Sequence, residues 1–160
     1  SLVFFNAQEG VLVAADALWE NGFGVVFPEL DGESGFDEVG EVLDLIERLP
    51  VRWVVPGHGA PFADVDGALQ RARKRLASHR ADPSRHARHA GKVLIKYHLM
   101  EVGELPLEAL RDWGRQTPLM AATQRAAGVA GPTGDWFEDL LADLLGSGAL
   151  RRDGETVRDA

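Results

Sequence analysis

The sequence predicts a mixed α/β fold in which a small sheet is followed by a mainly helical module. Apolar strands at 11–15 and 51–55 flank a helical pattern, and this order predicts a strand–helix–strand crossover with parallel pairing. A strongly amphipathic helix and a closing hairpin end the chain. The 160 residues provide room for one ordinary domain or two small ones.

The composition is that of a globular protein without disulfides. It is 45% hydrophobic and 26% charged, and no apolar run approaches the length of a membrane span. Because the chain has no cysteine, any metal would need His, Asp or Glu ligands, and a thiol nucleophile is excluded. No signal-peptide pattern opens the sequence, which predicts a cytoplasmic protein that has no membrane partner.

The net charge of −8 conceals three blocks of alternating sign. Residues 1–66 carry net −11, residues 67–100 carry net +8, and residues 101–160 carry net −5. Such a segregation of charge along the chain indicates that the chain consists of separate structural or functional parts. We therefore expect an incomplete sheet domain over 1–66, a basic helical connector over 67–101 and a helical domain over 102–160.

The first block predicts a hairpin, a loop, a helix and a further strand. Strands at 2–6 and 11–15 are joined by a four-residue turn that ends in Gly10. The second strand is apolar throughout, as expected for a strand covered on both faces. A Gly- and Pro-rich loop follows, and helical spacing then begins at Phe36, with Ser34 and Asp37 at capping-box positions. A chain that opens on an apolar strand is expected to be the C-terminal portion of a longer protein.

The remainder predicts helices and one hairpin. Helices are expected from 63 to about 80, from 85 to 101, from Leu105 through Trp113, and from 118 to 127. The amphipathic helix bears Trp136, Phe137, Leu140, Leu141, Leu144 and Leu145. The hairpin over 149–158 turns at Asp153-Gly154. Helices followed by a terminal hairpin predict a winged-helix-like module.

Two polar residues follow the two apolar strands of the crossover. Asp16 ends the first strand, and His58 follows the second between two glycines. Because ligands of open α/β sheets collect at the carboxyl ends of strands, both side chains are candidate ligands for a divalent cation such as Zn²⁺. Taken alone, Asp16 is equally consistent with a turn or helix cap, and His58 with a polar loop residue.

These same segments resemble a known family. The run 11–18, VLVAADAL, looks like the strand that bears the bridging aspartate of metallo-β-lactamase-fold hydrolases, and the run 54–59, VVPGHG, looks like their last histidine motif. The resemblance covers about residues 1–62, and the closest likeness is to the glyoxalase-II-like and general hydrolase branch. It implies the C-terminal half of an αββα sandwich with one or two zinc ions, in which Asp16 bridges two metals and His58 binds the second.

The resemblance is incomplete. The family's His-x-His-x-Asp-His motif and the single histidine that follows it belong upstream of the two matching segments, and neither occurs in this chain. Two ligands seldom hold zinc tightly, so we expect weak or absent zinc binding and no activity from this chain alone. In the complete hydrolase, metal would activate water against an ester, thioester, amide or phosphodiester of a small-molecule substrate.

Other side chains have two interpretations. Trp19 and Phe23, in the loop after Asp16, are candidates for lining a substrate pocket, although packing beneath the loop is the favoured interpretation. The basic block is interpreted first as a partner for the acidic sheet domain. It is interpreted second as a nucleic-acid surface, for which the candidate residues are Arg73, Arg88, Lys92, Arg151 and Arg152.

Three hypotheses follow. The first is the C-terminal portion of a zinc hydrolase, which would fail if no His-x-His-x-Asp-His motif were encoded upstream. The second is a nucleic-acid-binding winged-helix protein, which salt-dependent binding to duplex DNA or RNA would test. The third is a dimerising assembly module, because an incomplete sheet exposes an apolar face that a missing N-terminal half or a second copy would cover.

Overall fold

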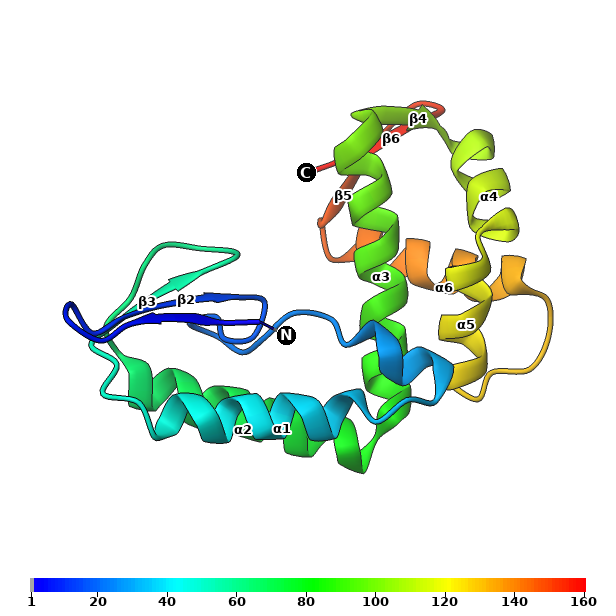
Figure 1. Ribbon diagram of the computed structural model, residues 1–160. Coiled ribbons are helices and arrows are strands. Elements are labelled where there is room, and N and C mark those ends of the chain that lie inside the picture. Colours follow the sequence, from blue (N-terminus) through cyan, green and yellow to red (C-terminus); the bar gives the residue numbers. More distant parts are fainter. Residues whose placement is uncertain (1) are drawn as a thin grey trace. The chain divides into compact units, whose positions relative to one another are not determined.

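The computed structural model describes residues 2–160, which form two compact units (Figure 1). The sheet unit comprises the described residues through Glu29 together with Glu33–Asp82, and the helical unit comprises Leu30–Gly32 and Pro83–Ala160. The connector expected over 67–101 is therefore not a unit of its own. Its first helix belongs to the sheet unit and its second to the helical unit, and the chain is divided where Pro83 interrupts the helical pattern.

The sheet unit is built on three strands in the order β1-β2-β3. Strand β1 (Phe4–Asn6) pairs antiparallel with β2 (Val11–Ala15), and β2 pairs parallel with β3 (Trp53–Pro56). The expected hairpin and the parallel pairing of the crossover are confirmed, although β1 is shorter than expected and Ser1 lies outside the described residues. The Asn6 side chain accepts hydrogen bonds from the backbone N–H groups of Gln8 and Glu9 in the turn.

Helix α1 (Gly35–Glu47) connects β2 to β3 and is preceded by the short 3-10 helix η1 (Phe27–Asp31). The capping box expected at Ser34 is wrong, because the Ser34 side chain makes no capping hydrogen bond. The Glu29 carboxylate instead accepts the backbone N–H of Phe36. An acceptor from the preceding 3-10 helix thus satisfies one of the free N–H groups of the first helical turn.

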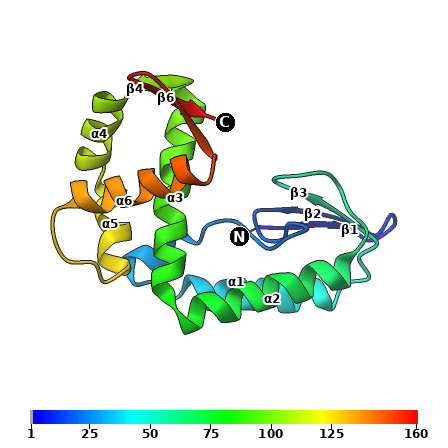
Figure 2. The same ribbon diagram turned by 180° about the vertical axis from the view of Figure 1, so that it is seen from behind.

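The core of the sheet unit lies on one face of the sheet. Figures 1 and 2 show α1 and α2 (Val65–Ala81) side by side on that face. Leu12, Ala14 and Val54 point into it and are completely buried. They pack with apolar side chains of the loop and the two helices, chiefly Leu18, Phe23, Phe36, Leu43, Ile46, Leu69 and Leu76. Each large side chain buried in this way contributes roughly 1.5–3 kcal/mol.

The opposite face of the sheet is open in the described chain. Phe4, Val13, Trp53 and Val55 alternate with the core residues, and between 37% and 64% of each is exposed. Phe4 lies opposite Val13, and Val13 lies opposite Val55, so the exposed side chains form a continuous row across the three strands. The expectation that β2 is covered on both faces is therefore wrong within these residues, because both helices pack on the same face.

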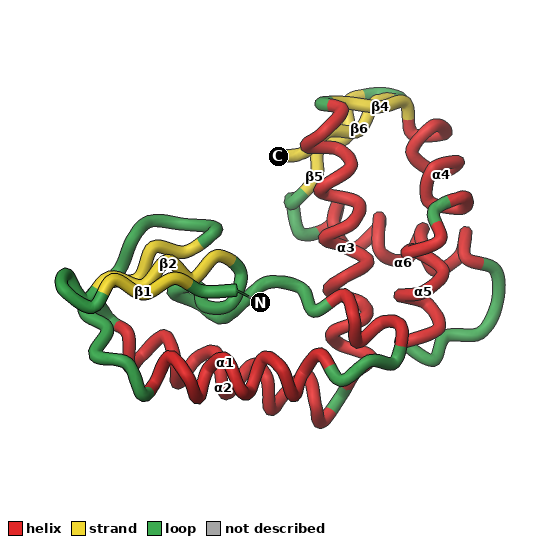
Figure 3. Tube along the Cα trace, in the orientation of Figure 1, coloured by secondary structure: helices red, strands yellow, loops and turns green. Residues whose placement is uncertain are grey.

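The helical unit combines four helices with a small antiparallel sheet (Figure 3). Its helices are α3 (Pro83–Val102), α4 (Leu107–Gln116), α5 (Pro118–Ala126) and α6 (Thr133–Gly146). Its strands are β4 (Glu104–Pro106), β5 (Leu150–Asp153) and β6 (Thr156–Asp159), in the order β4-β6-β5. The terminal hairpin is confirmed, but Gly154 and Glu155 form its turn, one residue later than expected.

The helix expected to begin at Leu105 begins at Leu107 instead. Leu105 pairs with Val157 of β6, and this long-range contact makes Glu104–Pro106 a strand. The unit's core is the apolar face of α6, where Trp136, Phe137, Leu140, Leu141 and Leu144 are buried as the periodicity predicts. Gly114 of α4 is also buried there, and the Phe137 ring fills the space that a side chain at this position would need.

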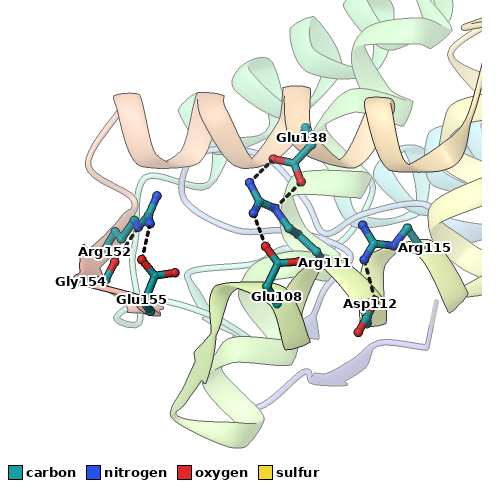
Figure 4. Close-up of polar contacts among 8 residues, drawn as sticks. All are labelled: Glu108, Arg111, Asp112, Arg115, Glu138, Arg152, Gly154 and Glu155. Carbon is teal, nitrogen blue, oxygen red and sulfur yellow. Dashed lines mark hydrogen bonds and ion pairs between the residues drawn. The ribbon is translucent and has the colours of Figure 1, made fainter.

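Polar contacts fasten α4 to α6 (Figure 4). The Arg111 guanidinium donates to both carboxylate oxygens of Glu138, at 2.7 and 3.1 Å, and also to Glu108. Deeper in the unit, the Trp136 indole N–H donates to the buried Thr123 hydroxyl at 2.9 Å. None of the helices in residues 2–160 is both long enough and apolar enough to cross a membrane.

A buried histidine makes the stability of the sheet unit depend on pH. His79 of α2 is buried, and the centroid of its ring lies 6.0 Å from that of the Phe23 ring and 5.9 Å from that of the Phe36 ring. Burial, and secondarily the neighbouring Arg75 guanidinium, lower the pKa of His79 below its usual value of 6.5. The unfolded chain therefore takes up the proton more readily, and the folded state loses stability as the pH falls below 6.5.

We expect the free energy of unfolding, measured with urea, to decrease between about pH 7 and pH 5 in the natural chain. His79→Leu should flatten this dependence, because it removes the titrating group from the core. His98→Leu is the control, since His98 stacks on Trp113 in the helical unit. An equal pH dependence in the His79 variant and the natural chain would contradict the assignment.

Candidate functional site

The candidate site is built where β2 ends. Ala15, the last residue of the strand, has φ +45°, which is the left-handed region that side chains other than glycine rarely adopt. The register of β2 against β3 shifts between Val13 and Ala15, so that Ala15 lies opposite Pro56. Bulges and strained backbone are both enriched at functional sites. A residue held in such a strained backbone conformation costs about 1–3 kcal/mol of folding free energy.

Two hydrogen bonds to one oxygen hold this strained end. The Ala15 carbonyl accepts the backbone N–H of Gly57 at 2.8 Å and the indole N–H of Trp19 at 3.1 Å. The first bond joins the end of β2 to the residue that precedes His58. The second bond fixes the position of the Trp19 ring. A single carbonyl oxygen thus positions both the backbone before His58 and the Trp19 side chain.

Asp16 lies between two glycines. A Cβ atom at Gly57 would lie 2.8 Å from Asp16 Oδ1, and a Cβ atom at Gly24 would lie 2.8 Å from Asp16 Cβ. The Gly24 backbone N–H also donates to the Asp16 carbonyl at 2.9 Å. Only residues without a side chain fit at these two positions unless the aspartate moves. The Asp16 side chain is exposed and makes no capping hydrogen bond among the described residues.

His58 follows Gly57 directly and is therefore carried to the same edge of the sheet as Asp16. The His58 side chain is exposed, and its ring lies 5.0 Å from the Trp19 ring at an interplanar angle of 76°. This edge-on geometry is the favoured one for aromatic pairs. The structure thus brings Asp16 and His58 to the carboxyl ends of adjacent parallel strands, as the sequence predicted.

The two pocket candidates occupy different positions. A pocket of about 130 Å³ lies beside Asp16, and Phe23, which is only 1% exposed, contributes to its wall. Trp19 does not line that pocket and instead contacts His58. Phe23 therefore packs beneath the loop and also borders the pocket. Gly24 belongs to no motif that the sequence predicts to be functional, although the spacing of Gly22 and Gly24 after Asp16 is a local signal of close backbone approach.

Two donors do not complete a zinc site. The side chains that the structure describes, those of residues 2–30 and 32–160, include no group of three or more His, Cys, Asp or Glu that could hold a metal ion. Catalytic zinc sites use three protein ligands and structural sites use four. The donor chemistry of Asp16 and His58 suits zinc, but the described chain alone does not fit a tightly held ion.

Three arginines of α2 pair with acids of the sheet unit, which agrees with the first interpretation of the basic block. In α2, Arg73 contacts Asp44 and Glu47 of α1 at 2.7 and 2.6 Å, and Arg80 contacts Asp37 at 2.7 Å. The hydrogen bond that Arg73 donates to Asp44, followed by contacts with Glu47, raises the pKa of the Arg73 guanidinium above its usual range. Charges of opposite sign thus meet between the two helices.

The basic residues of α3 pair within the helical unit instead. Arg88 and Lys92 both contact Asp143 of α6, at 2.9 and 3.4 Å. Arg88 is the largest contributor to a lowered pKa of the Asp143 carboxyl. In the hairpin, Arg152 contacts Glu155, as Figure 4 shows, while Arg151 is exposed. The five nucleic-acid candidates are therefore divided between two units, and four of them are in ion pairs.

Comparisons with known proteins return a structural likeness. No family model matches the chain, and no curated protein matches it. Among solved structures, the chain is similar to a metallo-β-lactamase family protein from Thermus thermophilus, with 21% identity and a TM-score of 0.36. The alignment covers 99% of this chain and 44% of that protein, so the chain spans less than half of that protein's length.

The contact between Trp19 and His58 can be tested by a conservative change. Trp19→Phe keeps an aromatic ring but removes the N–H group that is anchored on Ala15, so the ring should become mobile. We expect the carbon-bound ring protons of His58 to shift in the NMR spectrum, because the ring current beside them changes. Trp53→Phe, on the open face of the sheet, is the matched control. Unchanged His58 resonances in the Trp19 variant would refute the contact.

Proposed function

We propose that this chain contributes part of the active site of a metal-dependent hydrolase, with Asp16 and His58 as two of the metal ligands. The reaction class is hydrolysis of an ester, thioester, amide or phosphodiester, as the resemblance to metallo-β-lactamase-fold enzymes implies. The same proposal makes the helical unit, for which the sequence predicts a winged-helix-like module, an accessory part of the hydrolase. Zinc is the metal that His and carboxylate donors favour in this setting.

One observation carries the proposal most strongly. A strained Ala15, a bulge, and two glycines packed against Asp16 all occur within a few residues of the two candidate ligands. A turn that served only to connect elements would not need to combine these features. Strained backbone persists where the surrounding structure enforces it, and such enforcement is typical of sites that hold a ligand.

The remaining ligands must come from outside the described residues, and the open face of the sheet is a suitable place for their carrier to pack. The row formed by Phe4, Val13 and Val55 runs across the three strands. Sheets with an exposed apolar face gain stability when a second layer covers it. A covering layer would also extend to the edge at which Asp16 and His58 lie.

The metal proposal is tested by zinc titration of the chain after chelator treatment. We expect weak binding, reduced about tenfold or more by either Asp16→Ala or His58→Ala, because each variant removes one of two donors. Glu20→Ala and His98→Ala are matched controls that remove an acid and a histidine elsewhere. Binding that is equal in the double variant and the natural chain would exclude these two residues as ligands.

A second candidate function is that of an assembly module, and the open sheet face favours it. If a second copy covers this face, light scattering should give about twice the monomer mass at high concentration. Val13→Thr combined with Val55→Thr should then shift the protein toward monomer, since threonine keeps the β-branched shape but adds a hydroxyl.

Leu45→Thr is the control, because Leu45 is 41% exposed on α1, away from the sheet. A monomeric mass at every concentration would exclude the second copy as the covering partner.

The nucleic-acid hypothesis stays a prediction, and salt-dependent binding to duplex DNA or RNA remains its test.

A further inference from the structure

The pocket beside Asp16 has a shape and charge that point to a particular ligand. It has a volume of about 130 Å³ and lies between the loop after β2 and the first turns of α1. Its walls are mainly apolar and include Phe23, Val25, Val26, Pro28, Val39 and Val42. Phe23 and Val26 are buried, so this part of the wall belongs to the core of the sheet unit.

The volume limits the size of the ligand. An apolar protein cavity of about 150 Å³ accommodates benzene, which has six non-hydrogen atoms. A pocket of about 130 Å³ therefore has room for about five or six such atoms. Because the walls are mainly apolar, the part of the ligand that enters should be a short hydrocarbon chain.

The charges of the pocket have one sign. Asp16 and Glu38 are its two charged lining residues, and no described Lys, Arg or His lines it. Both acids are exposed, and neither carboxylate forms an ion pair with a described basic side chain. The neighbouring acids Asp37 and Asp44 do have arginine partners. The Arg75 guanidinium lies 5.6 Å from the centroid of the Phe23 ring but does not line the pocket. The two carboxylates that do line it favour cations over anions.

We propose that the pocket binds a short alkylammonium group, with the hydrocarbon chain against Phe23 and Val39 and the charged end toward Asp16 and Glu38. As a statement about substrate it rests on the proposed function. Glu38 then provides the charge, because Asp16 would hold the metal, and the substrate class is a compound with a short, positively charged alkyl arm. As a statement about binding it needs no metal, because the apolar walls and Glu38 are independent of any metal site.

The test uses three probes of nearly equal size on the natural chain in the presence of a metal chelator. Pentylamine is an ammonium ion at neutral pH, 1-pentanol is neutral and pentanoate is an anion. We expect pentylamine to shift the backbone amide resonances of Val25, Val26 and Val39 with an affinity in the millimolar range. Pentanol should bind several-fold more weakly than pentylamine, and pentanoate more weakly still.

Two variants connect the preference to the pocket. Glu38→Gln keeps the shape of the side chain and should reduce the ratio of pentylamine to pentanol affinity about threefold, as expected for an exposed charge. Glu41→Gln is the matched control, because Glu41 is an exposed acid of the same helix that does not line the pocket. Val39→Phe should fill the pocket and abolish the binding of both probes.

Each outcome decides the proposal. Equal binding of pentanoate and pentylamine, equal effects of the Glu38 and Glu41 variants, or no shift at the pocket residues with any probe would overturn it. If zinc binding fails to depend on Asp16 and His58 while pentylamine binds as described, the metal proposal fails and the pocket remains. If zinc binding behaves as expected and pentylamine does not bind, the pocket proposal alone fails.

Discussion

The Ala15 carbonyl oxygen is the point on which the candidate site depends. It accepts N–H groups from Gly57 and Trp19, so one atom connects β2, the residue before His58 and the aromatic ring that contacts His58. Each hydrogen bond contributes about 1 kcal/mol, which is of the same order as the cost of the left-handed Ala15 backbone. The two hydrogen bonds therefore offset a cost of similar size that arises from the strained Ala15 backbone.

The segregation of charge along the chain becomes local pairing in the folded protein. Arg73 and Arg80 pair with acids of α1, whereas Arg88 and Lys92 pair with an acid of α6. These partners are exposed or half-buried, and such surface pairs contribute at most about 1 kcal/mol each. These ion pairs join α2 to α1 and α3 to α6. The free energy of folding comes mainly from the two apolar cores.

The long elements were predictable because their patterns repeat. The apolar face of α6 and the crossover from β2 to β3 extend over enough residues for the periodicity to be unambiguous. Short features were missed. Strand β4 has three residues and exists because Leu105 pairs with Val157, far along the chain. The cap of α1 is Glu29, which no local motif around Ser34 indicates.

For the site, the sequence by itself determined the chemistry of the donors and their placement after two strands. Asp16 and His58 could be identified because each ends an apolar run, and a run of that kind is a local property. Only the tertiary structure decided that Trp19 contacts His58, that Phe23 borders a pocket with Glu38, and that one face of the sheet stays open. The physical reason is that residue type and periodicity are local properties, whereas burial, ring contacts and unpaired charge depend on which distant residues fold against one another.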